Sequence, residues 1–239
     1  MSTEAIAVEK PKRNYNVLFG LTLLALLVLL WIVLSVATPS FASGNNLANL
    51  LRQGSMIAIM AVGQTFVIIT GGIDLSVGAV VGFATVVVAM MINAGFPIWL
   101  AILVTLLVGV AIGMFHGFGI VKMGLPPFII TLATLTSLRG IGLLMTNGNS
   151  ININSDTFTA FSRNSFIGIP NLFWMVILVG IPAYVFLHHS RWGRYLFSVG
   201  SNAEASRLSG VNVQRTIYMA YTLSGLCAAF VCVLLAARI

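Results

Sequence analysis

The stretch IWLAILVTLLVGVAIGMFHGFGIV, residues 98–121, decides the fold class of this chain. It contains no Asp, Glu, Lys or Arg. A helix that crosses the hydrocarbon core of a bilayer needs about 20 predominantly apolar residues, and this stretch meets that requirement without a break. It therefore predicts a membrane-spanning helix.

The composition extends this prediction to the whole chain. Of 239 residues, 59% are hydrophobic and 7% are charged, whereas soluble domains carry about 25% charged residues. Because so few charges cannot cover the surface of a soluble protein, most of the surface of this chain must face membrane lipid. The net charge of +7 comes from basic residues at the ends of apolar runs. No basic stripe alternates with aromatic residues, and nucleic acid is therefore not an expected partner.

Seven apolar runs predict an all-α fold, a polytopic transmembrane helical bundle of about seven spans. They form one membrane domain, residues 1–239. A signal peptide with cleavage near Ser35-Val36-Ala37 is a competing interpretation of the first run, but the run exceeds the roughly 7–15 apolar residues of a signal peptide. The expected spans are 17–36, 50–70, 76–92, 98–121, 128–145, 172–187 and 217–237.

The distribution of basic residues predicts the orientation, because cytoplasmic loops carry an excess of Lys and Arg. The rule is best satisfied with the N-terminus in the cytoplasm. Residues 1–16 then form a cytoplasmic tail, the polar loop 147–170 lies outside, and the polar stretch 188–215 lies inside. Arg52 and Arg163 fall outside, while the basic residues that fall inside are Lys10, Lys12, Arg13, Lys122, Arg191, Arg194, Arg207 and Arg215.

Small residues recur every four positions on two of the spans. The fourth span carries Gly109, Gly113 and Gly117, and the third carries Gly78 and Gly82. Small residues at this spacing let helix backbones approach closely in a membrane. Both spans are therefore expected to pack tightly against neighbouring helices, and chance spacing in a chain with 23 glycines is the alternative for a single pair such as that on the third span.

The motifs of an enzyme are absent from the sequence. None of the three lysines lies in a phosphate-binding G-x-x-x-x-G-K-[ST] loop, and no two carboxylates lie close together. His116 stands alone on the fourth span, and the adjacent His188 and His189 do not have a metal-ligand spacing. Cys227 and Cys232 are expected to be buried thiols, because they form no metal or redox motif. The sequence thus predicts neither an enzyme nor a metal site.

Asp74 lies in ITGGIDLSVGAVVGF, residues 69–83, and is the only charged residue of that stretch. A charge at the centre of a spanning helix costs about 2.5–3.5 kcal/mol on insertion scales. Gly71 and Gly72 interrupt the apolar run, and Asp74 is expected to cap the third span, accepting hydrogen bonds from its first N–H groups. A role in a substrate path stays open, because broken helices line cavities in transporters.

Arg139 is a second charge within a predicted span, the fifth. It is expected to face other helices, not lipid. Its partners would be backbone carbonyls or Asp74, and a place in the substrate path is the alternative.

The stretch SNAEASRLSG, residues 201–210, predicts a short helix within the cytoplasmic segment. Ser201 or Asn202 can cap it, Glu204 lies in its first turn, and Gly210 fits its C-terminal end. Isolated helices shorter than about 12–15 residues are marginal in water. A partner that docks on this helix would stabilise it, and a helix packed on its own domain is the alternative.

Three separated segments resemble the membrane permeases of ribose-type bacterial ABC importers. They are ITGGIDLSVGAVVGF, GRYLFSVGSNAEASRLSGVNV and YTLSGLCAAFVCVLLAAR, in this order, and TLATLTSLRGIGLLMTNG adds a fourth. The similarity runs from around Leu30 to the last residue. It implies a multi-pass permease of the bacterial inner membrane that imports a monosaccharide and leaves ATP hydrolysis to another subunit.

The resemblance also implies partners and residue roles. The partners are a cytoplasmic ABC ATPase that holds ATP and magnesium, a periplasmic sugar-binding protein and a second permease subunit, so no cofactor is expected in this chain. The coupling helix that fits the ATPase would comprise Ala203, Glu204, Ala205, Arg207, Leu208 and Gly210. The broken helix or substrate path would comprise Gln64, Thr70, Gly71, Gly72, Asp74, Ser76 and Arg139.

One departure from the family pattern bears on function. Family permeases continue past Ile239 with further spans, so the chain is expected to be truncated at its C-terminus. Three alternatives stay open: an amino-acid or nucleoside cargo, a proton-coupled secondary transporter that uses Asp74, and a shortened protein that assembles without transporting.

Overall fold

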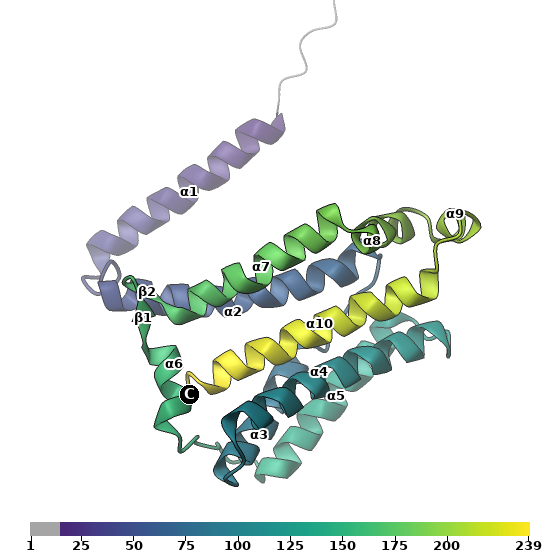
Figure 1. Ribbon diagram of the computed structural model, residues 1–239. Coiled ribbons are helices and arrows are strands. Elements are labelled where there is room, and N and C mark those ends of the chain that lie inside the picture. The colour runs from purple at the N-terminus through teal and green to yellow at the C-terminus, as the bar shows by residue number, and fades with distance from the viewer. Residues whose placement is uncertain (1–14) are drawn as a thin grey trace, which may run out of the picture. The chain divides into compact units, whose positions relative to one another are not determined.

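A computed structural model describes residues 15–239 (Figure 1). The chain falls into two units, one that ends at Asn49 and one that comprises Leu50–Ile239. The boundary lies within a helix. The predicted cytoplasmic tail, except for its last two residues, lies outside the described residues.

Helices dominate the described chain, which confirms the predicted fold class. Six of them are long and apolar enough to cross a membrane, and a shorter apolar helix accompanies them. In chain order the elements are α1 Tyr15–Ala37, α2 Gly44–Ile69, α3 Val77–Asn93, α4 Ile98–Val121, α5 Pro127–Thr146, α6 Asp156–Arg163, β1 Ser165–Phe166, β2 Ile169–Pro170, α7 Asn171–His189, α8 Arg191–Ser201, α9 Ala203–Leu208 and α10 Val213–Ala236.

The first unit contains α1 and the start of α2. The apolar side chains of α1 from Leu21 to Val36 are mostly exposed, as suits a helix that contacts lipid. Trp31 and Phe41 stack edge to face with ring centroids 5.3 Å apart. Asn46 donates a hydrogen bond to the Phe41 carbonyl at 2.7 Å, which fixes the turn that leads into α2.

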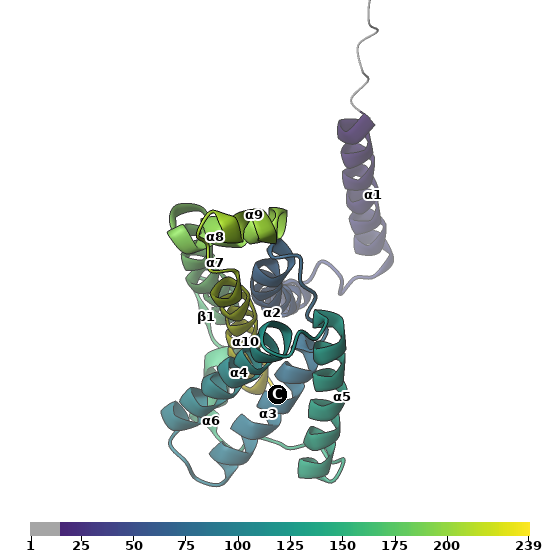
Figure 2. The same ribbon diagram turned by 90° about the vertical axis from the view of Figure 1, so that its right-hand side faces the viewer.

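The second unit has polar elements at both ends. Viewed in Figures 1 and 2, α8 and α9 lie across one end, and α6 with the short β1–β2 ladder lies at the other. The α8–α9 end carries Arg191, Arg194, Arg207 and Arg215. That the α8–α9 end faces the cytoplasm stays a prediction from the distribution of basic residues.

The core of this unit is the contact between α4 and α10, which run antiparallel. A Cβ atom at Gly109 would overlap the Gly225 carbonyl, and one at Gly113 would overlap the Tyr221 carbonyl. At Gly117 it would lie 2.6 Å from the Tyr218 ring. The prediction of close backbone packing along this stripe is confirmed.

The same prediction is wrong for α3. Nothing lies within 4 Å of a Cβ atom built at Gly78 or Gly82. Both glycines instead line a cavity between α3 and α5. The spacing alone could not separate a packed stripe from an open one, because it carries no information about the opposite helix.

Several predicted boundaries move. Residues 147–170 contain α6 and the two short strands, and residues 188–215 contain α8 as well as the expected short helix. The helix α10 starts at Val213, four residues before the apolar run. Its first turn is polar because Asn212 caps it, accepting a hydrogen bond from the Arg215 N–H at 2.9 Å.

The helix α3 spans 17 residues, which is the lower end of the range of about 17–25 residues for a helix that crosses a bilayer. Asp74, just before it, contacts Ser224 of α10. At a rise of 1.5 Å per residue, Ser224 lies about 16 Å along α10 from Val213. The start of α3 therefore lies beside the middle of α10, and residues 70–76 join α2 to α3 as non-helical backbone.

Candidate functional site

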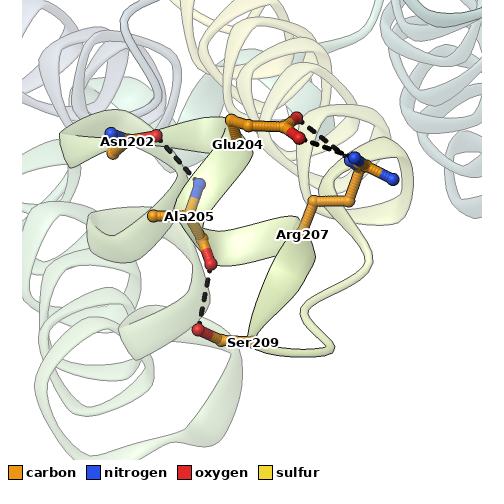
Figure 3. Close-up of polar contacts among 5 residues, drawn as sticks. All are labelled: Asn202, Glu204, Ala205, Arg207 and Ser209. Carbon is orange, nitrogen blue, oxygen red and sulfur yellow. Dashed lines mark hydrogen bonds and ion pairs between the residues drawn. The ribbon is translucent and has the colours of Figure 1, made fainter.

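The helix α9 forms at the position that the sequence predicts, and Asn202 caps it. The Asn202 side chain accepts a hydrogen bond from the Ala205 N–H at 2.9 Å (Figure 3). Ser201 is instead the last residue of α8. At the other end, Gly210 has φ +83°, a left-handed conformation that glycine adopts without steric cost.

An ion pair joins one turn of α9. Arg207 donates to Glu204 through Nε at 3.0 Å and Nη2 at 2.6 Å (Figure 3). This pairing lowers the pKa of the Glu204 carboxyl and raises the pKa of the Arg207 guanidinium. A lowered carboxyl pKa means that the pair is fully formed at neutral pH and is lost only as the pH falls through that acidic value.

The outer surface of α9 is free of contacts within the described chain. Leu208 is 76% exposed, and Ala203 and Ala205 are also exposed. Ser206 alone is buried in this helix, where it forms a 2.6 Å hydrogen bond with Ser198 of α8. One face of α9 is therefore fixed to α8, and the other presents an apolar side chain between two charges.

The second feature is the break between α2 and α3. The hydroxyl of Thr70 donates to the Val67 carbonyl at 2.8 Å, which closes the end of α2. Gly71 has φ +77°, so the chain turns there. Gly72 has no such φ, but a Cβ atom at this position would press against the hydroxyl of Tyr221.

Asp74 is buried, but it is not the cap of α3 that the sequence predicts. The N-cap residue is Ser76. One carboxylate oxygen of Asp74 accepts from the Ser76 N–H at 2.9 Å and from the Ser76 hydroxyl at 2.6 Å. Asp74 lies two residues before the N-cap, so its carboxylate bonds Ser76 and not the first N–H groups of the helix.

The other carboxylate oxygen of Asp74 contacts α10. The Ser224 hydroxyl donates to it at 3.0 Å, and Gln64 of α2 donates to the Ser224 hydroxyl at 3.4 Å. One turn earlier on α10, the Tyr221 hydroxyl donates to the Ile73 carbonyl at 3.3 Å. Two polar contacts thus hold the break to α10, a third joins α2 to α10, and the buried carboxylate is satisfied by hydrogen bonds.

Sequence reasoning missed Tyr221 and Ser224. The two lie three residues apart and so share a face of α10, but about 150 positions separate Ser224 from Asp74. Nothing in the sequence around this tyrosine and serine indicated that they contact the break between α2 and α3. His116, which looked isolated, bonds Thr134 of α5 at 3.0 Å and lies against the Tyr221 ring.

Arg139 does not meet its predicted partners. Within residues 15–239 its side chain makes no hydrogen bond or ion pair. It lines a cavity of about 650 Å³ between α3 and α5. Polar lining groups also come from Thr85, Thr146, Asn149 and Ser150. Gln64 and Thr70 lie elsewhere, at the break.

Neither feature offers the elements of catalysis. Within the described part of the chain, no three His, Cys, Asp or Glu side chains gather into a possible metal site. Cys227 and Cys232 are buried and free.

Comparison with known proteins supplies the family. The permease family described as "Branched-chain amino acid transport system / permease component" matches residues 46–239. Ribose import permease protein RbsC of Escherichia coli (strain K12) is 40% identical over 243 residues, which cover 100% of this chain and 75% of that protein. The same protein of Bacillus subtilis (strain 168) is 38% identical over 242 residues, with 100% and 75% covered.

A relative with a different cargo also matches. Galactofuranose transporter permease protein YtfT of Escherichia coli (strain K12) is 32% identical over 237 residues, which cover 96% of this chain and 70% of that protein. No solved structure matches the chain.

The spanning helices and these similarities define a multi-pass membrane permease component of a bacterial ABC importer. The chain belongs to the family of branched-chain amino acid transport system permease components, within its ribose and sugar branch. Such a component is not an enzyme and carries no cofactor of its own. Its class implies an ATPase and a binding protein as partners, which replaces the hypothesis of a proton-coupled secondary transporter.

Proposed function

We propose that this chain forms the membrane passage of a monosaccharide importer, with ribose as the first cargo to test. The observation that carries the proposal is the 40% identity to a ribose import permease along the whole chain. The galactofuranose permease, at 32% identity, is a weaker guide to the cargo but also transports a sugar.

The cavity beside Arg139 is compatible with a neutral polar cargo. Its volume of about 650 Å³ lies within the range of about 300–1,000 Å³ for small-molecule sites. Hydroxyl and amide groups from Thr146, Asn149 and Ser150 line it, and such groups both donate and accept hydrogen bonds from sugar hydroxyls. Arg139 adds donors that no described residue uses.

A branched-chain amino acid is the second candidate cargo, because the family's description refers to that transport system. Its carboxylate would pair with Arg139, and its side chain would contact the apolar walls formed by Phe83 and Leu135. Substitution of Arg139 by Gln separates the two candidates, since loss of the positive charge weakens the binding of an amino acid carboxylate far more than the binding of a neutral sugar.

We further propose that α9 docks in the ATPase subunit. Its exposed Glu204, Arg207 and Leu208 are not used by the described chain for packing, and the helix is too short to be stable alone. ATP binding in the partner would move α9, and the spans would alternate between outward-facing and inward-facing states. Gly210 would end the docked helix.

Co-purification with the ATPase tests the docking role. Glu204→Ala removes the ion pair, and Gly210→Pro cannot adopt the positive φ of the native turn. Both are expected to reduce the bound ATPase severalfold while the protein still inserts in the membrane. Asp156→Ala is the matched control, because Asp156 is also an acidic residue in the first turn of a short helix, at the opposite end of the unit.

Uptake tests the cargo. A strain that lacks its own ribose importer receives this chain together with its ATPase and binding protein, and uptake of labelled ribose and labelled leucine is measured. Ribose uptake that depends on the chain supports the proposal. Equal uptake with and without the chain, while the ATPase still co-purifies, would contradict it.

A further inference from the structure

The helix break lies between the two elements that flank α9. Along the chain, α8 precedes α9 and α10 follows it, and both contact residues 69–74. Figure 2 views the second unit from the α8–α9 end, where α8 and α9 lie across the ends of the spans. A movement of α9 would therefore reach the break from two sides.

The contact with α8 is made at Gly200, the second-last residue of that helix. A Cβ atom there would overlap the Ile69 carbonyl oxygen and lie 3.4 Å from the Thr70 Cα atom. The two backbones are therefore in direct contact at the point where α2 ends. Any side chain at position 200 would have to push the break away.

The contact with α10 is made by side chains. Ser224 donates to the Asp74 carboxylate at 3.0 Å and Tyr221 donates to the Ile73 carbonyl at 3.3 Å. Both partners lie in non-helical backbone between α2 and α3, which can shift without unwinding a helix. The bond to Asp74 is the shorter of the two.

We propose that residues 70–76 are the element that α9 displaces inside the membrane, with Gly200, Tyr221 and Ser224 as positioning residues. The inference rests on the proposed docking of α9 on an ATPase. When that partner moves α9, α8 displaces the end of α2 through the contact at Gly200. At the same time α10 moves Asp74 through its bond to Ser224, and the start of α3 shifts with it. Since α3 lines the cavity beside Arg139, the displacement changes the passage.

Hydrogen–deuterium exchange of the purified permease provides the first test and requires no transport. ATPase binding is expected to change amide exchange in residues 70–76 of the wild type. In Ser224→Ala the ATPase still binds but this response is lost, whereas Thr222→Val, which removes an α10 hydroxyl that bonds only within its own helix, keeps it. Gly200→Ala is expected to raise exchange in the same residues even without ATPase, whereas Gly180→Ala, with nothing within 4 Å of the added atom, leaves it unchanged.

Proteoliposomes that contain the permease, the ATPase and the binding protein provide the second test. Loss of the buried hydrogen bond from Ser224 to Asp74 predicts about a tenfold lower maximal uptake rate in Ser224→Ala. The half-saturating sugar concentration should not change, and more ATP should be hydrolysed per sugar. Thr222→Val removes an α10 hydroxyl that bonds only within its own helix and is expected to behave as wild type.

The outcomes separate the two proposals. Wild-type exchange and uptake in Ser224→Ala, or an equal loss in Thr222→Val, would overturn the role of the break. Loss of ATPase binding in Ser224→Ala would also overturn it, because the residue would then act on docking. If Glu204→Ala leaves ATPase binding intact, the docking proposal itself fails, whatever Ser224 does.

Discussion

At the scale of the residue, the packing of the second unit depends on glycines, which have no side chain. The α4–α10 contact is possible because Gly109, Gly113 and Gly225 let the two backbones approach. In a membrane, helices associate mainly through such close packing, since lipid is as apolar as the helices themselves. A single methyl group at the contact must therefore separate them.

Gly113→Ala tests this packing. The added Cβ atom would lie 2.7 Å from the Thr222 Cα atom, and overpacking of this kind costs about 1–3 kcal/mol. A lower midpoint of thermal unfolding in detergent is expected. Gly140→Ala is the control, because nothing lies within 4 Å of its added atom. Equal stability of the two variants would contradict the packing.

At the scale of the element, the short helix α9 owes its form to its ends. Asn202 satisfies one N–H at its start, and Gly210 supplies the turn that ends it. Both were predictable from sequence, because caps act locally. The long-range contacts were not: Asp74 was expected to cap α3, and its contact with Ser224 depends on how α10 packs.

Asn202→Ala tests whether the cap shapes the docking surface. Loss of an N-cap costs about 1 kcal/mol of helix stability, so α9 should fray and ATPase co-purification should fall by about fivefold. Asn202→Ser keeps a capping oxygen and should retain binding. Loss of binding in both variants to the same degree would show that the amide itself, not the helix, is recognised.

At the scale of the whole molecule, the apolar runs predicted the spans well, since their length is imposed by the bilayer. The exceptions are instructive. The run at 76–92 is α3, Val77–Asn93, but it did not reveal that the residues just before α3 contact α10 through Ile73 and Asp74. Arg139 looked like a partner of Asp74, yet it lines a cavity, and only the packing of α3 against α5 could have revealed this.

The central claim is that α9 lies on the cytoplasmic side, where an ATPase can reach it. Single cysteines at Ala203 in α9 and at Thr157 in α6, both exposed, test it directly with a thiol reagent that cannot cross the inner membrane. The native Cys227 and Cys232 are buried, so the unsubstituted protein serves as the blank. The orientation predicts that Thr157→Cys reacts from outside and that Ala203→Cys reacts only after the membrane is permeabilised. Reaction of Ala203→Cys in sealed cells would contradict the account.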